Sequence, residues 1–242
     1  MKLFVLLALF TFQVFASGEI VKHKYFTINY NENHEVPNWV SYELELSHLR
    51  GCVSRSNSFK EDPLVKTGSA SNSDYKGSGF DRGHLLPAGD RKFSKEAMNE
   101  TFFLSNMTPQ PANFNRGKWG QLETLMRAWA LKHQKLWIVT GPVLEAGLPS
   151  IGRANQVSVP HQYFKVILRK EATSYKAIAF LISTSDLGRP LREYATSVNH
   201  VEEVSGQDFF KFLQSNEEEI EGQLNLADWD FSAKFQYLPC LL

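Results

Sequence analysis

The sequence is short of cysteine, carries no excess of one charge and has no hydrophobic run of membrane-spanning length. Two of its 242 residues are cysteine, and they are not clustered with histidines as a zinc site requires. Basic and acidic residues number 26 each, so the chain is not a globally basic nucleic-acid binder, and any attraction for phosphate must be local. With 43% hydrophobic and 21% charged residues, neither disorder nor a membrane protein is indicated.

The first 16 residues have the features of a secretory signal peptide. Lys2 supplies a positive charge, an apolar run follows, and Val14-Phe15-Ala16 resembles a cleavage site. The run is too short to favour a membrane span, although a retained membrane anchor is the alternative. We expect residues 1–16 to be removed and residues 17–242 to act in the periplasm or the medium, free of the membrane. Loss of Lys2 leaves 25 basic residues against 26 acidic ones, a net charge of −1.

Cys52 and Cys240 are the only two cysteines. An exported protein folds under oxidising conditions, and an even pair of cysteines then permits one disulfide. This bond would close most of the chain into a loop. The alternative is two buried free thiols.

Residue periodicity predicts one α+β domain with a mostly antiparallel sheet and no interdomain linker. Alternating patterns at 24–30 and 39–46 predict strands, and apolar runs at 163–168 and 177–183 predict neighbouring antiparallel strands. The main helix is expected at 115–132, where apolar residues recur at helical spacing. Further expectations are a helix capped by Ser94, a buried strand at Thr101–Leu104, a helix capped by Asp208, a final strand at Phe235–Leu238, and loops at 31–38 and 60–79.

Residues that can carry chemistry are concentrated between Phe80 and Glu123. Asp81-Arg82-Gly83-His84 puts a carboxylate, an arginine and a histidine within four residues. A histidine can take a proton from water near neutral pH, and an arginine can pair with phosphate oxygens. His84 is therefore the candidate general base, Arg82 the phosphate contact and Asp81 a structural hydrogen-bond partner. Local attraction of phosphate is expected from Arg82, Arg91, Lys92, Arg116, Lys118 and Arg127.

Asn115, Trp119 and Glu123 follow at i, i+4 and i+8 and would share one face of a helix. Asn115 and Glu123 would be separated by roughly 12 Å of axial rise, so one ion could not easily bind both directly. We therefore expect Asn115 to bind Mg²⁺ directly and Glu123 to hold it through a water, because Mg²⁺ keeps several waters and accepts few protein oxygens. Mn²⁺ is expected to substitute for Mg²⁺. Trp119 is expected in the core rather than stacked on a base.

Three motifs together resemble the DNA/RNA non-specific endonuclease family, which includes mitochondrial endonuclease G and secreted sugar-nonspecific bacterial nucleases. The motifs are Asp81 to His84, Leu104 to Gln110 and Asn115 to Glu123. The resemblance covers most of the chain after residue 16. It implies a ββα-metal (His-Me finger) active site within a single endonuclease domain.

The resemblance also assigns roles residue by residue. It implies His84 as general base, Arg82 on phosphate, Asn115 on Mg²⁺ and Glu123 as the partner of the metal through water. Asn106 and Gln110 become supporting residues. Arg55 stands where the family often has an arginine ahead of an aromatic residue, which implies a second phosphate contact; the alternative is a surface arginine in a loop.

The implied function is an exported, Mg²⁺-dependent endonuclease that hydrolyses DNA and RNA with little sequence preference. DNA and RNA would be its partners. The sequence leaves open whether the protein forms a homodimer, and it identifies no inhibitor protein. Three other functions fit the sequence less well. A phosphatase of small esters would need more carboxylates around two metals, and an inactive nucleic-acid-binding relative would have lost His84 or Asn115. A purely structural exported domain would have no reason to assemble the four polar groups.

Overall fold

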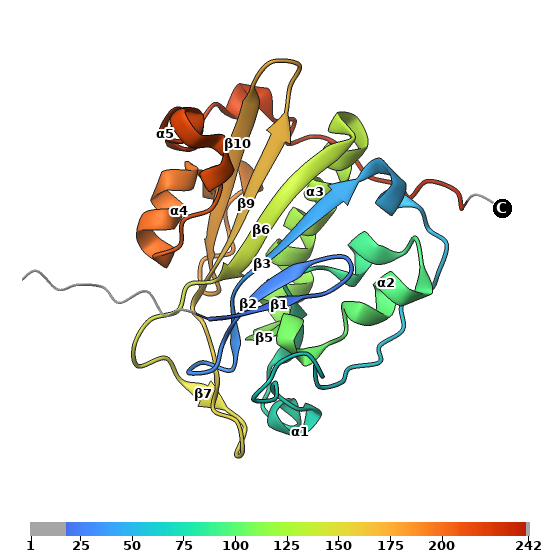
Figure 1. Ribbon diagram of the computed structural model, residues 1–242, viewed down its shortest axis with the longest axis vertical. Coiled ribbons are helices and arrows are strands. Elements are labelled where there is room, and N and C mark those ends of the chain that lie inside the picture. Colours follow the sequence, from blue (N-terminus) through green and yellow to red (C-terminus); the bar gives the residue numbers. More distant parts are fainter. Residues whose placement is uncertain (1–17, 241–242) are drawn as a thin grey trace, which may run out of the picture.

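The structure is a computed structural model that describes residues 18–240, and a seven-stranded antiparallel sheet forms its centre (Figure 1). The spatial order of the strands is β1-β2-β3-β6-β9-β10-β11. The strands predicted at 39–46, 163–168 and 177–183 are confirmed as β3, β9 and β10, and the one at 24–30 overlaps β2. The strands are β1 (Glu19–Lys22), β2 (Thr27–Asn31), β3 (Val36–Glu45), β6 (Lys135–Pro142), β9 (Gln162–Lys170), β10 (Tyr175–Ser183) and β11 (Ala195–Thr196).

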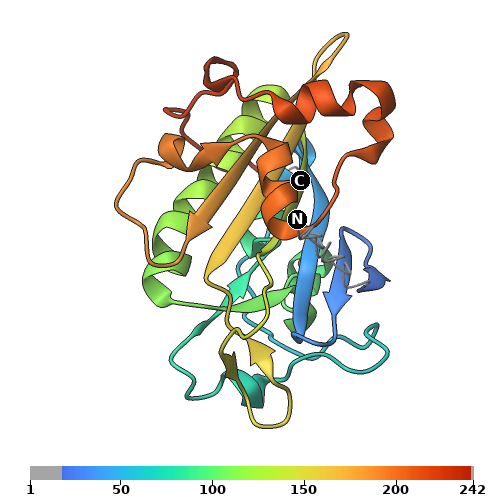
Figure 2. The same cartoon turned by 90° about the vertical axis from the view of Figure 1, so that its left-hand side faces the viewer.

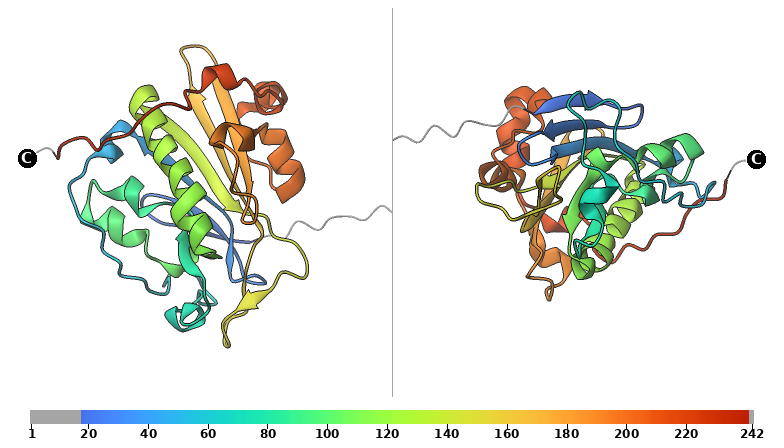
Figure 3. Two further views of the ribbon diagram at one scale, coloured as in Figure 1. Left: turned by 180° about the vertical axis from the view of Figure 1, so that it is seen from behind. Right: turned by 90° about the horizontal axis from the view of Figure 1, so that it is seen from below.

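Helices cover both faces of the sheet (Figures 2 and 3). The long helix α3 (Gly120–His133) lies on one face, and α4 (Val198–Ser205) with α5 (Glu217–Gly222) packs on the other. Because side chains alternate along a strand, Ile138 packs in the cluster under α3, whereas its neighbour Val139 packs in the cluster under α4. Burial on both faces explains why β9 and β10 are apolar for most of their length. The single α+β domain with a mostly antiparallel sheet is thus confirmed.

The main helix begins with a π-helical turn, Phe114–Trp119, and continues as α3. A regular helix was expected here, but the Gly120 N–H donates to the Asn115 carbonyl, five residues back. Such turns occur frequently at functional sites. Trp119 is fully buried, as predicted, and its Nε1–H donates to the His84 carbonyl at 3.3 Å. The predicted apolar stripe is buried throughout: Trp119, Leu122, Leu125, Met126 and Trp129.

A second, two-stranded sheet stands beside the large one. Its strands β4 (Asp81–His84) and β5 (Met107–Gln110) pair in antiparallel register, and the chain passes from β5 into the π-helical turn and α3. These elements form the expected ββα arrangement. Ser94 caps α2 (Lys95–Glu100) between the two strands, as predicted, because its Oγ accepts from the Ala97 N–H. The other short elements are α1 (Asn72–Tyr75), the two-stranded pair β7 (Ser150–Ile151) and β8 (Val157–Ser158), and the 3-10 helices η1 (Leu46–Leu49), η2 (Ala88–Arg91), η3 (Leu104–Asn106), η5 (Leu191–Tyr194), η6 (Lys211–Asn216) and η7 (Leu226–Asp228).

The predicted strand at 101–104 and the predicted loop at 31–38 are wrong. Thr101–Leu104 leaves α2 and enters η3 instead of forming a strand, since four buried apolar residues cannot distinguish a strand from the end of a helix. Pro37 belongs to β3 rather than to a loop at 31–38. It lies opposite Tyr30 beside a register shift, where the missing N–H of proline is tolerated.

Three expectations near other connections are also corrected. Residues 60–79 contain the helical turn α1. Asp208 caps no helix, because α4 has already ended at Ser205 and the next turn starts after Phe210. Phe235–Leu238 is an extended segment with one isolated bridge, from Leu238 to Arg50, so it is not a strand of either sheet.

The predicted signal peptide at residues 1–16 lies outside the described residues, and its removal stays a prediction. Among the helices of residues 18–240, none is long and apolar enough to cross a membrane.

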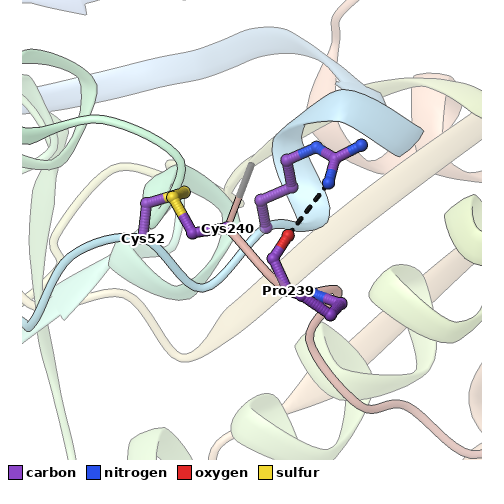
Figure 4. Close-up of a disulfide and its surroundings, with 4 residues drawn as sticks. Cys52, Pro239 and Cys240 are labelled. Atoms are coloured by element: carbon purple, nitrogen blue, oxygen red, sulfur yellow. Dashed lines mark hydrogen bonds between the residues drawn. A yellow bond between two sulfur atoms is a disulfide. The ribbon is translucent and has the colours of Figure 1, made fainter. Parts of the chain in front are cut away.

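The structure contains a disulfide between Cys52 and Cys240, 188 residues apart (Figure 4). It joins the end of the chain to the segment that follows β3. Hydrogen bonds beside it strengthen the same junction: Arg50 Nη1 donates to the Pro239 carbonyl at 2.9 Å, and the Gly51 N–H donates to the Leu238 carbonyl at 3.0 Å. The C-terminal segment is therefore held by backbone hydrogen bonds and, at Cys240, by the disulfide.

Candidate active site

A pocket of about 480 Å³ lies where β4, the π-helical turn and α3 meet. These elements carry two of the three motifs that the sequence singled out, and the third motif contributes β5, which pairs with β4. The segment 50–60 and the start of the 3-10 helix η2 (Ala88–Arg91) complete the wall. The lining residues are Arg55, Phe59, Phe80, Asp81, Arg82, His84, Pro87, Ala88, Gly89, Asn115, Arg116 and Glu123.

His84 lies at the end of β4 and is 6% exposed. Its Nε2 is buried and has no hydrogen-bond partner among residues 18–240. The imidazole meets the Phe102 ring edge-on, with ring centroids 5.0 Å apart. Burial, together with the positive charge of Arg55, lowers the pKa of His84 to about 3. The imidazole is therefore neutral at physiological pH, the state in which it can accept a proton.

Two arginines on the pocket wall are held against aromatic rings. The Arg82 guanidinium lies 4.5 Å from the centroid of Phe59, and the Arg55 guanidinium lies 5.0 Å from that of Phe102. The two rings themselves pack edge to face at 4.9 Å. Cation–π contacts of this kind restrain a guanidinium without neutralising it. Arg55 is an exposed residue outside any helix or strand, and it lines the pocket together with Arg82.

Asp81 organises the polar groups that the π-helical turn brings to the pocket. Its Oδ2 accepts from Asn115 Nδ2 at 2.9 Å, and Arg116 pairs with both of its oxygens at 2.6 and 2.8 Å. The hydrogen bonds from Arg116 lower the pKa of Asp81, with a smaller contribution from Asn115. Because the amide nitrogen of Asn115 is engaged, its Oδ1 is the atom left for another partner. Within residues 18–240 no hydrogen bond to that oxygen occurs.

Glu123 is half-buried and lines the pocket from α3, and charged residues lie behind it. Asp90 accepts from Arg127 Nη1 at 2.8 Å, and Lys165 extends from β9 to lie 4.9 Å from the Trp119 ring centroid. Burial raises the pKa of Glu123 to about 7, against the opposing effect of Arg127 and Lys165. Burial likewise lowers the pKa of Lys165 to about 8. Asp90, Arg127 and Lys165 are each at most 8% exposed, so only Glu123 of these four lines the pocket.

Asn106 and Gln110 stand behind the pocket and do not belong to its lining in the described residues. Asn106 Oδ1 accepts from the Leu86 N–H at 2.9 Å, and Nδ2 donates to the Leu86 and Thr101 carbonyls. Gln110 is fully buried, and a Cβ on Gly83 would lie only 2.1 Å from its side chain. Both residues thus shape the backbone around His84, as supporting residues would.

Two arginines expected to attract phosphate are instead structural. Arg91 is fully buried and donates to the carbonyls of Asp90, Tyr25 and Glu43, and Arg127 pairs with Asp90. The sequence interpretation also missed Phe59, Asp90 and Lys165. The apolar context of Lys165, within the β9 run Tyr-Phe-Lys-Val-Ile-Leu, is the one signal that could have marked it, because a lysine in a buried strand needs a counter-charge.

Fold and site first define a class: a ββα protein whose pocket gathers a neutral histidine, arginines and oxygen donors. Comparison with protein families then gives the particular assignment. The model for "DNA/RNA non-specific endonuclease" matches residues 7–216. The chain belongs to the DNA/RNA non-specific endonuclease family.

Known relatives agree with this assignment. The chain is 35% identical over 206 residues to the mitochondrial nuclease EXOG of Danio rerio, covering 78% of this chain and 60% of the relative. It is 35% identical over 211 residues to nuclease C1 of Cunninghamella echinulata var. echinulata, covering 81% and 84%. A chain from the crystal structure of the EndoG/EndoGI complex matches with a TM-score of 0.75 at 28% identity, covering 83% and 89%. The chain spans 55–60% of the length of the EXOG relatives.

Proposed function

We propose that this protein is an exported endonuclease that uses Mg²⁺ to hydrolyse phosphodiester bonds of DNA and RNA with little sequence preference. The observation that carries the proposal is the unpartnered Nε2 of His84, on a neutral imidazole in an arginine-lined pocket. An imidazole whose Nε2 is free can accept a proton from water, and the charge of a bound phosphate would oppose the effect of Arg55 on the pKa of His84. Membership of the family supports the class of substrate.

The oxygens of Asn115 and Glu123 fit a hard divalent cation. Asp81 engages the nitrogen of the Asn115 amide and leaves Oδ1 available; the Glu123 carboxylate faces the same pocket. Amide and carboxylate oxygens suit Mg²⁺, and enzymes of this family depend on a metal, typically Mg²⁺. Asn115 would hold the ion directly and Glu123 through a water, and Mn²⁺ would substitute. Bound there, the ion would neutralise charge on the phosphate and the departing oxygen.

The remaining roles belong to the residues of the chain itself. Arg82 and Arg55 would bind phosphate oxygens, while Nε2 of His84 takes the proton from the attacking water. Asp81 keeps the Asn115 amide oriented. Contacts to phosphate position a substrate without reading bases, so broad cleavage follows. Attack by water also needs no ribose 2′-hydroxyl, which places DNA among the substrates beside RNA.

The proposed location is outside the cytoplasm, in the periplasm or the medium. Disulfides persist in oxidising compartments, and the Cys52–Cys240 bond fits export. DNA and RNA are the proposed partners, and a homodimer stays a prediction. The EndoG/EndoGI complex concerns a relative that binds an inhibitor protein.

The test is to incubate residues 17–242 with closed circular plasmid, linear single-stranded DNA and RNA, each with Mg²⁺ or with chelator. We expect Mg²⁺-dependent cleavage of all three, weakened by salt because phosphate binding releases counterions. His84→Ala should abolish cleavage while leaving folding and, largely, nucleic-acid affinity intact. His161→Ala, at an exposed histidine outside the pocket lining, serves as the matched control. RNA-only cleavage, activity in chelator, or a plasmid that stays closed would contradict the proposal.

The two metal assignments can be separated by titration with Mg²⁺. Asn115→Ala should lose metal-dependent activity, whereas Glu123→Ala should retain a remnant, because a contact through water is more easily replaced. Equal and complete loss of metal binding in both variants would make Glu123 a direct ligand.

A further inference from the structure

Phe80 occupies an unusual place at the edge of the pocket. It immediately precedes β4 and lines the pocket beside Asp81 and Arg116. Its side chain is half-buried. An aromatic ring at this point faces the same space as the arginines that the proposed function assigns to phosphate.

The ring of Phe80 has no aromatic or cationic partner among residues 18–240. Every other phenylalanine among residues 18–240 has another aromatic ring within stacking or edge-to-face distance. Phe80 has no such neighbour, and no cation lies over its face in the described part of the chain. It also lies outside the four hydrophobic clusters of residues 18–240. Core packing therefore does not account for a large apolar side chain at this position.

The backbone around Phe80 is fixed although its ring joins none of the hydrophobic clusters described above. The Phe80 N–H donates to Ser78 Oγ at 3.2 Å, and Ser78 Oγ donates to the Tyr75 carbonyl at 2.8 Å. Gly77 and Gly79 adopt positive φ angles of 74° and 83°, a conformation that favours glycine. This turn leads directly into the paired strand β4, so the ring is presented to the pocket from a defined support.

Single-stranded nucleic acid is recognised by cationic groups along the backbone and aromatic rings on which bases stack. The pocket offers both, because Arg55, Arg82 and Phe80 all line it. We propose that Phe80 is the stacking surface for the base of a nucleotide adjacent to the scissile phosphate. Because base faces are covered inside a duplex, the site then favours unpaired nucleotides over paired ones. This inference rests on the proposed function and names the substrate conformation that the site takes.

The decisive experiment pairs a change in the protein with a change in the substrate. Short single-stranded DNA with one cleavable phosphodiester, its other linkages being methylphosphonates, is compared with two forms that lack the base on either side of that bond. Phe80→Ala should raise KM for the complete substrate roughly 5- to 150-fold with kcat little changed. The effect should vanish with one of the abasic forms. Phe80→Trp should restore the low KM, and Phe212→Ala, at a 57% exposed phenylalanine, should change nothing.

A second measurement needs no turnover. In the His84→Ala background, quenching of 2-aminopurine beside the central phosphate should report stacking, and Phe80→Ala should remove it. Equal KM losses on complete and abasic substrates, or quenching that persists without Phe80, would overturn the inference. If the unmodified protein cleaves nothing, the proposed function fails, and the fluorescence still decides whether Phe80 stacks.

Discussion

Removing the Cys52–Cys240 disulfide should reduce stability by more than the loss of a typical hydrogen bond does. The bond joins residues 188 apart, so nearly the whole described chain lies within the loop that it closes. In the chain-entropy model a loop of this length lowers the entropy of the unfolded chain by about 18 cal/mol/K, or about 5 kcal/mol at 25 °C. Measured losses for native disulfides are about 2 to 5 kcal/mol. We therefore expect Cys52→Ser/Cys240→Ser to lose at least about 2 kcal/mol.

Equilibrium unfolding in urea measures this loss, and thermal unfolding gives an independent check. For a domain of this size each kcal/mol shifts the melting temperature by about 2–4 °C, so a fall of at least about 4 °C is expected. A reductant should destabilise the unmodified protein by a similar amount and leave the double serine variant unchanged.

A matched variant separates the disulfide from the packing of the C-terminal segment. Tyr237 donates a hydrogen bond to the Gly89 carbonyl at 2.9 Å, and Tyr237→Phe removes only that bond, at a cost of about 1 kcal/mol. If the double serine variant loses no more than Tyr237→Phe does, loop closure is not what stabilises the fold. Destabilisation of the double serine variant by reductant would refute the reasoning as well.

Three further predictions concern buried groups. Burial, with Glu202 nearby, raises the pKa of Glu221 to about 7, so its ionisation costs stability increasingly as pH rises from about 4.5 to about 7; Glu221→Gln should add about 1–3 kcal/mol at pH 8 and nothing at pH 4.5, measured by urea unfolding. Gly83→Ala should lower the free energy of unfolding by about 1–3 kcal/mol, because the added Cβ would lie 2.1 Å from the buried Gln110 side chain. A Cβ added at Gly188 would meet nothing within 4 Å, so an equal loss in Gly188→Ala would argue against a local clash. Lys165→Met should lower the free energy of unfolding by about 1–3 kcal/mol more in the unmodified protein than in the Glu123→Gln variant. Additive losses in this double-mutant cycle would show that the two charges do not interact.

The sheet could be predicted from sequence where pattern and burial agree. β9 and β10 are apolar runs separated by a short polar turn, and a helix with an apolar stripe has few other ways to bury it. The errors arose where a tertiary contact decides the local structure. Pro37 enters β3 because the register with β2 shifts beside it, and nothing in the neighbouring residues shows that shift.

The candidate site also has a part that the sequence predicts and a part that depends on tertiary contacts. His84, Arg82 and Asn115 belong to two compact motifs, so their chemistry could be inferred before their geometry was known. Arg55 needed the structure, because its position depends on packing over Phe102 across 47 residues of chain. The π-helical turn was also unpredictable, since the residues at 114–119 are compatible with a regular helix.

Charged residues, rather than apolar ones, are buried behind Glu123. Asp90, Glu123, Arg127 and Lys165 are two acids and two bases, so the group can be neutral as a whole, yet each member loses hydration on burial. A buried ion pair is often no more stabilising than apolar residues of the same volume, and Lys165 Nζ has no hydrogen-bond partner among residues 18–240. Stability alone would therefore favour apolar side chains at positions 90, 127 and 165. Of the four, Glu123 alone lines the pocket, and two buried cations stabilise its carboxylate there. The array is thus better explained by the carboxylate that it maintains at the pocket wall than by any contribution to folding.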